Sequence, residues 1–206
     1  MLSEIVLKEL DAARKSGEQL EAIAVVEKVY PRSERNLLLL AYWDLVSDFH
    51  RGIHATLTSE FHASAFALVR PVVESLVRAH VAVRGVDDDV ALLLNDKYRV
   101  NLETIGPWID QAFGLNGMMA RFLNERTRKA LHGYTHVGLH QLGRRFDQGY
   151  VKGQYSDAEI IEISRVTTSA FFMLSLLLTK HFGFEDDWKK VGDLFAEWGK
   201  HGSTSP

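Results

Sequence analysis

Two rows of side chains in this 206-residue sequence could do chemistry. The first consists of Arg70, Glu74 and Arg78, which recur every four residues and so share one face of a helix. The residues between them are almost all apolar, which predicts a helix at the centre of a fold. Because an isolated buried charge costs several kcal/mol, we expect these three side chains to be paired.

Pro71 lies inside the same row. Its ring nitrogen cannot donate to the carbonyl of Ala67, so we expect a kink or a free acceptor beside the charges. One interpretation is a polar pocket in which the arginines bind an anion such as phosphate. The other is a network of ion pairs that only ties the helix to its neighbours. The spacing alone does not separate these two interpretations.

The second row also has a four-residue spacing and comprises His132, His136, His140 and Arg144. Gly133, Gly138 and Gly143 interrupt it, each at roughly 1 kcal/mol against alanine inside a helix. Either the helix breaks here, or the glycines admit another backbone or a ligand. Tyr134 and Thr135 add hydroxyl groups. Histidine near neutral pH can act as a general acid or base, bind a metal, or fill a hydrogen-bonded core position.

A third grouping raises the possibility of a metal. His50 and His54 are four residues apart on an expected helix. With Glu74 and two histidines of the second row, they could hold a metal inside a helical bundle. The spacing permits such a site without requiring it, so we assign no metal ligand and no cofactor.

Helical periodicity runs along nearly the whole chain, and no segment alternates as a half-buried strand does. Three long helices are expected over 34–57, 59–84 and 157–180. Capping residues precede the first and last of these, at Ser33 and at Ser156 with Glu159. Shorter helices are expected over 4–16, 18–29, 87–95, 101–113, 117–131 and 186–200, with the first two separated at Ser16-Gly17. The sequence therefore predicts an all-α, up-and-down helical bundle with three long helices and several short ones.

Length and composition restrict the protein class. We expect one domain over 1–200 and a disordered tail over 201–206. A net charge of −3 argues against extended DNA as a partner, and the absence of cysteine excludes disulfides and thiolate chemistry. The first residues lack a signal pattern, and the apolar run 169–178 is shorter than the roughly 20 residues that span a bilayer. We therefore expect a cytoplasmic protein that does not contact a membrane.

The segment from Arg70 to Arg78, followed downstream by Gly133-Tyr134-Thr135-His136-Val137-Gly138, resembles an uncharacterised bacterial family of small all-helical proteins. Its members share an Arg-Pro-x-x-Glu-x-x-x-Arg helix and a Gly-x-Thr-His-x-Gly turn. The resemblance spans most of the chain. It implies an all-helical fold and carries no settled activity.

A more distant resemblance is to the HEPN superfamily, which includes metal-independent endoribonuclease toxins and anti-phage effectors. Its mark is an arginine and a histidine separated by four to six residues, a spacing that Arg126 and His132 match. Thr127, which follows the arginine, is polar but is not the asparagine, aspartate or histidine usual there.

The HEPN resemblance implies a chemistry for these residues. His132 or His136 would act as general base on an RNA 2′-hydroxyl and then protonate the leaving oxygen. Arg126 or Arg128 would stabilise charge that develops on the phosphate. The resemblance also implies a homodimer that joins two sites in one cleft, RNA or a nucleotide as substrate, and a role in bacterial defence.

Whether the chain is an enzyme at all stays open at this point. The main alternative is a non-catalytic helical module that senses a small anion or a protein partner. Its candidate ligand-binding residues are Arg70, Glu74, Arg78, Tyr134, Thr135, His140 and Arg144. A metal-binding bundle is the third possibility.

Overall fold

A computed structural model describes residues 2–25, 28–114, 116–123, 133, 146–147, 150–151, 153 and 155–203. Its helices are α1 (Glu4–Val25), α2 (Glu34–Thr58), α3 (His62–Arg84), α4 (Asp87–Leu94), α5 (Leu102–Phe113), α6 (Met118–Phe122), α9 (Asp157–His181) and α10 (Glu185–Ser203). Two short strands, β1 (Phe146–Asp147) and β2 (Tyr150–Val151), pair in antiparallel fashion. The predicted all-α helical bundle is confirmed.

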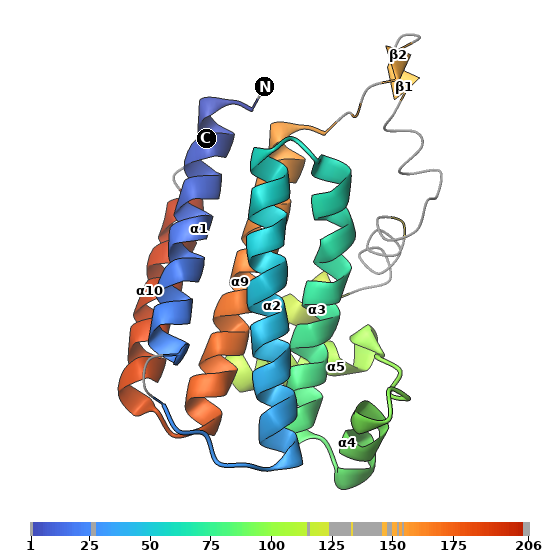
Figure 1. Cartoon of the computed structure of the whole chain (residues 1–206), viewed down its shortest axis with the longest axis vertical. Coiled ribbons are helices and arrows are strands. Elements are labelled where there is room, and N and C mark those ends of the chain that lie inside the picture. Colours follow the sequence, from blue (N-terminus) through green and yellow to red (C-terminus); the bar gives the residue numbers. More distant parts are fainter. Residues whose placement is uncertain are drawn as a thin grey trace.

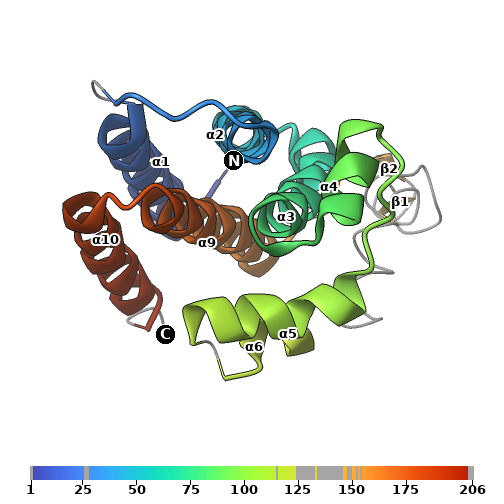
Figure 2. The same cartoon turned by 90° about the horizontal axis from the view of Figure 1, so that it is seen from below.

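Helix α9 is the centre of the bundle. It contacts α1, α2, α3 and α10, which surround it in two perpendicular views (Figures 1 and 2). Helices α2 and α3 are antiparallel neighbours, whereas α3 and α9 run in the same direction (Figure 1). By length and composition α9 could cross a membrane, but 72% of its most apolar window is buried inside the bundle. Such burial is what the core helix of a bundle requires.

The predicted break at Ser16-Gly17 is wrong, because α1 continues without interruption through both residues. Its buried apolar side chains follow one another at spacings of three, four and seven residues: Val6, Leu10, Ala13, Leu20 and Ala24. Gly17 fills the gap in this stripe. A Cβ atom on Gly17 would lie 2.6 Å from Cε1 of the His50 ring. The glycine is therefore required by packing between α1 and α2 and does not end the helix.

The predicted capping residues of two long helices are confirmed. The Ser33 hydroxyl accepts a hydrogen bond from the backbone N–H of Asn36 at 3.2 Å. Ser156 and Glu159 form a capping box at the start of α9. At the other end of the chain, α10 extends past the predicted boundary at residue 200, as far as Ser203. A helix is expected over 117–131, and α6 is the helix in the described part of this segment.

Candidate functional site

The charged row of α3 lies on the surface of the bundle. Helix α3 continues through Pro71, and its opposite face buries Val69, Val72, Val73, Leu76 and Val77 in the core. The side chains of Arg70, Glu74 and Arg78 remain 33%, 27% and 23% exposed. The prediction that this helix lies at the centre of the fold is therefore wrong, because these charges keep one face of α3 partly exposed.

Each member of the row has a partner, as expected. Nε of Arg70 donates to Oε1 of Glu74 at 2.7 Å. Nη1 of Arg78 lies 3.7 Å from Oδ1 of Asp96. Asp96 follows α4 in a left-handed backbone conformation, with φ at 53°, and its side chain is 96% exposed. Water screens such an exposed pair, so the contact with Asp96 holds Arg78 only weakly.

All three charged side chains line one open pocket of about 520 Å³ between α2 and α3, here called the α2–α3 pocket. Its α2 wall consists of Tyr42, Leu45 and Phe49. Its α3 wall consists of Arg70, Pro71, Glu74, Ser75 and Arg78, and Asp96 lies at its edge. A guanidinium group suits a carboxylate or phosphate, and a half-buried aromatic wall suits a flat ring.

The residues of the α2 wall were missed from the sequence, although a signal for them existed. Tyr42, Leu45 and Phe49 occur at i, i+3 and i+7 and so form an apolar stripe on one face of the helix. Such a stripe looks the same whether it faces a core or a pocket. Asp96 lies in a turn far along the chain from α3, and no periodicity connects it with Arg78.

His50 and His54 do lie together, on a different face of α2. Their ring centroids are 4.3 Å apart, and Nε2 of His50 lies 3.0 Å from the hydroxyl oxygen of Thr168 on α9. Glu74 is not with them. Among the described residues, no group of three or more histidines and carboxylates could hold a metal. The structure therefore does not bring His50, His54 and Glu74 together as the ligands of one metal.

Burial controls the protonation of both histidines. The His50 pKa lies well below its ordinary value, chiefly because the ring is buried and secondarily because His54 and Arg51 are near. Burial also lowers the pKa of His54 to about 4. Both imidazoles are therefore neutral at pH 7, when each can donate one hydrogen bond and accept one.

The remaining candidate residues lie outside the part of the chain that the structure describes. These are the proposed catalytic residues Arg126, His132 and His136, and the proposed ligand-binding residues Tyr134, Thr135, His140 and Arg144. Of the two predicted rows of functional side chains, the structure thus describes the one formed by Arg70, Glu74 and Arg78. No family model, no curated protein and no solved structure matches this chain.

Proposed function

We propose that this protein is a helical module that binds a small nucleotide-like anion in the α2–α3 pocket. The observation that carries the proposal is the shared pocket itself. Arg70 and Arg78 line one side of it, and Tyr42 and Phe49 line the other. Charge on one wall and aromatic rings on the facing wall match a molecule that joins a phosphate to a flat ring.

Arg78 is the residue we expect to bind the phosphate directly. Its contact with the exposed Asp96 is long, at 3.7 Å, so an incoming phosphate can replace that carboxylate at little cost. Arg70 is already hydrogen-bonded to Glu74 through Nε. That bond orients the guanidinium group, so Arg70 would position the ligand while Arg78 carries most of the charge pairing.

Tyr42 and Phe49 provide the preference for a ring. Both are half-buried and pack against the core, which fixes their orientation before a ligand arrives. Stacking of a base on an aromatic side chain is worth about 1–3 kcal/mol. A nucleoside monophosphate should therefore bind more tightly than inorganic phosphate, and adenosine without a phosphate should bind more weakly than adenosine monophosphate.

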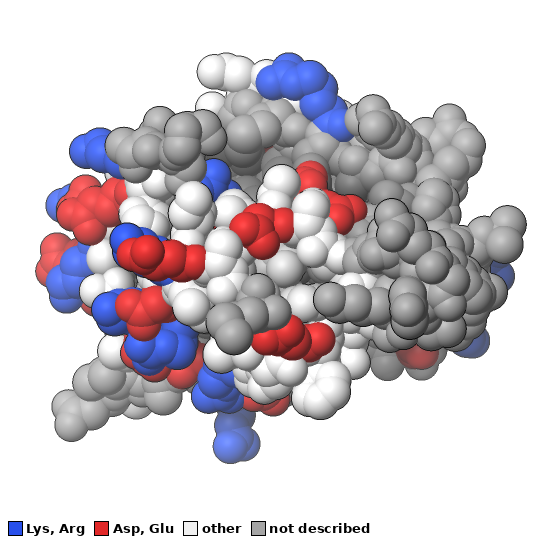
Figure 3. Space-filling view, turned by 90° about the horizontal axis from the view of Figure 1, so that it is seen from above, with Lys and Arg blue, Asp and Glu red and all other residues white. Residues whose placement is uncertain are grey.

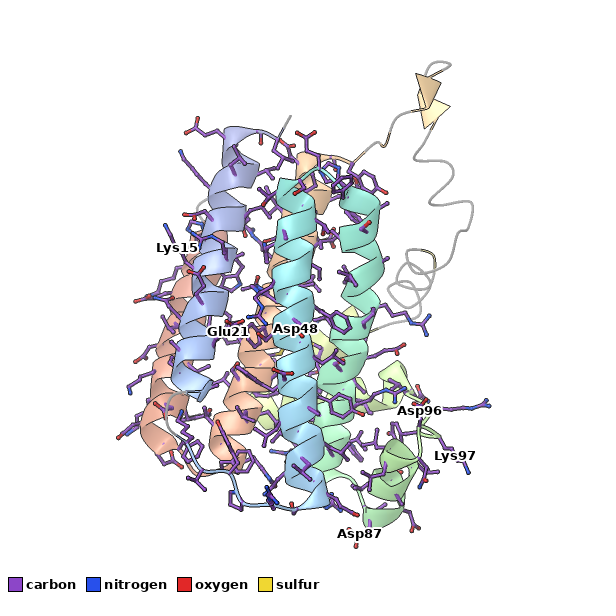
Figure 4. The ribbon with its side chains drawn as sticks, viewed as in Figure 1. Lys15, Glu21, Asp48, Asp87, Asp96 and Lys97 are labelled. Carbon is purple, nitrogen blue, oxygen red and sulfur yellow. The ribbon has the colours of Figure 1, made fainter. Side chains whose placement is uncertain are left out.

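Isothermal titration of the full chain with adenosine monophosphate tests the proposal. Arg78→Gln should weaken binding about tenfold or more, since a hydrogen bond to a charged group contributes about 1.5–3 kcal/mol. Lys97→Gln is the matched control, because it removes an exposed positive charge beside Asp96 that does not line the pocket (Figure 4). Equal affinities for the two variants, or no binding by the unchanged chain, would contradict the proposal.

An RNA-cleaving enzyme is the second candidate function. It is supported by the all-α bundle, the fold class that the HEPN resemblance implies, and by the spacing of Arg126 and His132. In this proposal His132 or His136 is the general base, Arg126 stabilises the phosphate, and two chains join their sites in a homodimer.

Incubation of a defined RNA with the purified chain separates the two candidates. Cleavage by the unchanged protein that is lost in His132→Ala and His136→Ala, with melting temperatures preserved, would support the enzyme. Intact RNA together with tight binding of adenosine monophosphate would exclude the enzyme and support the binding module. Sedimentation of the same samples measures the oligomeric state.

A further inference from the structure

A second pocket, of about 620 Å³, opens between α1 and α2 and is here called the α1–α2 pocket. Leu10 and Gly17 of α1 and His50, His54 and Ala55 of α2 are among the residues that line it. Its size falls in the range typical of small-molecule sites, about 300–1,000 Å³. The absence of a side chain at Gly17 lets the His50 ring pack directly against the α1 backbone.

His54 is the unusual group in the α1–α2 pocket. Its side chain is only 5% exposed, and neither ring nitrogen has a hydrogen-bond partner within the described residues. The neighbouring His50 differs, because it meets the hydroxyl of Thr168. A buried polar group without a partner costs about 1–3 kcal/mol. A ligand that supplies a partner for His54 would recover this free energy.

The charged groups of the α1–α2 pocket are already paired with one another. Arg14 contacts Asp11 at 2.7 Å and Glu18 at 2.5 Å, and Arg51 lies 3.5 Å from Glu21. Glu21 lies on the side of α1 that faces α2, as the labels of Figure 4 show. Figure 3 shows side chains of both signs interspersed over the side of the bundle formed by α1 and α10. Because Arg14 and Arg51 are paired with carboxylates, the rim of the α1–α2 pocket offers a charged ligand no unpaired counter-charge.

We propose that the α1–α2 pocket binds a small, uncharged organic molecule that carries a hydroxyl or amide group on an apolar body, with His54 as its hydrogen-bond partner. Leu10 and the methyl group of Ala55 contact the apolar body. The hydroxyl or amide group bonds to the neutral imidazole, which has one donor and one acceptor to offer. This site shares no lining residue with the α2–α3 pocket and is independent of the function proposed there.

The ligand reaches the imidazole through a rotation of the ring. Both nitrogens of His54 are covered by protein while the ring itself lines the pocket. The torsion about the Cβ–Cγ bond of histidine has broad, roughly two-fold energy minima, so the ring rotates more easily than a side chain with three narrow minima. Binding should therefore change the environment of the His54 ring more than that of any other histidine in the described part of the chain.

Three probes with the same ring distinguish the features of the proposal: benzyl alcohol, toluene and benzoate. Nuclear magnetic resonance titrations of the full, histidine-labelled chain should show benzyl alcohol binding at least fivefold more tightly than either of the others. The His54 ring signals should shift with benzyl alcohol. Equal affinity for benzyl alcohol and toluene, preference for benzoate, or no binding by any probe would overturn the proposal.

Four variants locate the site. His54→Phe should reduce affinity for benzyl alcohol to that for toluene, and an unchanged affinity in this variant would overturn the role of His54. Ala55→Phe should abolish binding by filling the opening, whereas Ala41→Phe, an exposed position of α2 outside both pockets, should leave it unchanged. Arg78→Gln should also leave benzyl alcohol binding unchanged, which keeps this test separate from the α2–α3 pocket. Melting curves verify that each variant folds.

Discussion

Helix α2 contributes a wall to two pockets that hold different kinds of polar group. In the α2–α3 pocket the polar groups are charged, and the side chains of Arg70 and Glu74 remain 33% and 27% exposed. In the α1–α2 pocket the innermost polar groups are His50 and His54, which are 2% and 5% exposed. The carboxylates and arginines there stay at the rim.

The difference shows how depth selects the residue type. An arginine that remains partly exposed keeps part of its hydration, so the charge of Arg78 survives with only the distant carboxylate of Asp96 beside it. An imidazole that is taken fully out of water loses its proton instead, because neutrality costs far less than a buried charge. One pocket is therefore suited to anions and the other to uncharged molecules, although the same helix lines both.

Acidification should lower the free energy of unfolding, and the buried His54 of the α1–α2 pocket should account for a large part of the loss. Burial lowers the pKa of His54 from 6.5 to about 4, so between these values the unfolded chain binds a proton that the folded chain does not. The stability that comes from the neutral ring is complete above pH 6.5 and falls as the pH decreases toward 4. For His54 alone the loss is about 3 kcal/mol. Urea unfolding at pH 7.5 and at pH 4 measures it.

His54→Phe is the control for this pH dependence, because it keeps a buried ring and removes the titrating group. The variant should lose less stability on acidification than the unchanged chain. Some loss should remain, since burial also lowers the pKa of His50 and, with help from Arg84, lowers that of His80 to about 4. Identical pH profiles for the two proteins would show that His54 is not buried as described.

The contact between α1 and α2 is tested by Gly17→Ala. Helix propensity alone predicts stabilisation by about 1 kcal/mol. The new Cβ, however, would lie 2.6 Å and 2.8 Å from two atoms of the His50 ring, and overpacking costs about 1–3 kcal/mol. We expect a net loss of about 1 kcal/mol. Gly192→Ala in α10 has open space around it and should stabilise, so equal gains from both variants would argue against the His50 contact.

Gly17 also shows where sequence reasoning reached its limit. Taken by itself the glycine predicts a helix end, but the apolar stripe of α1 continues on both sides of it. Its reason is a side chain on another helix, which no local pattern contains. The same holds for the pairing of Arg78 with Asp96. By contrast, the long helices, their capping residues and the row formed by Arg70, Glu74 and Arg78 are set by local spacing, and these were predictable.

In the α2–α3 pocket, we expect a smaller effect on stability than that of Gly17→Ala. The coupling between Arg70 and Glu74, measured by a double-mutant cycle with Arg70→Met and Glu74→Gln, should be about 0.5 kcal/mol. The two side chains are partly exposed and lie at i and i+4, where water competes for both. A coupling above about 2 kcal/mol would place the pair among buried ion pairs. The contrast between the two pockets would then lose its physical basis.

The smallest expected effect is an improvement in anion binding. Asp96→Asn removes a carboxylate 3.7 Å from Arg78, which should raise affinity for adenosine monophosphate about two- to threefold, in line with an exposed pair. Asparagine tolerates the left-handed conformation at this position, so the backbone turn should survive. Asp88→Asn changes the net charge equally at an exposed site outside the pocket. If both variants gain equally, long-range charge and not competition at Arg78 limits binding, and Asp96 has no specific part in the α2–α3 pocket.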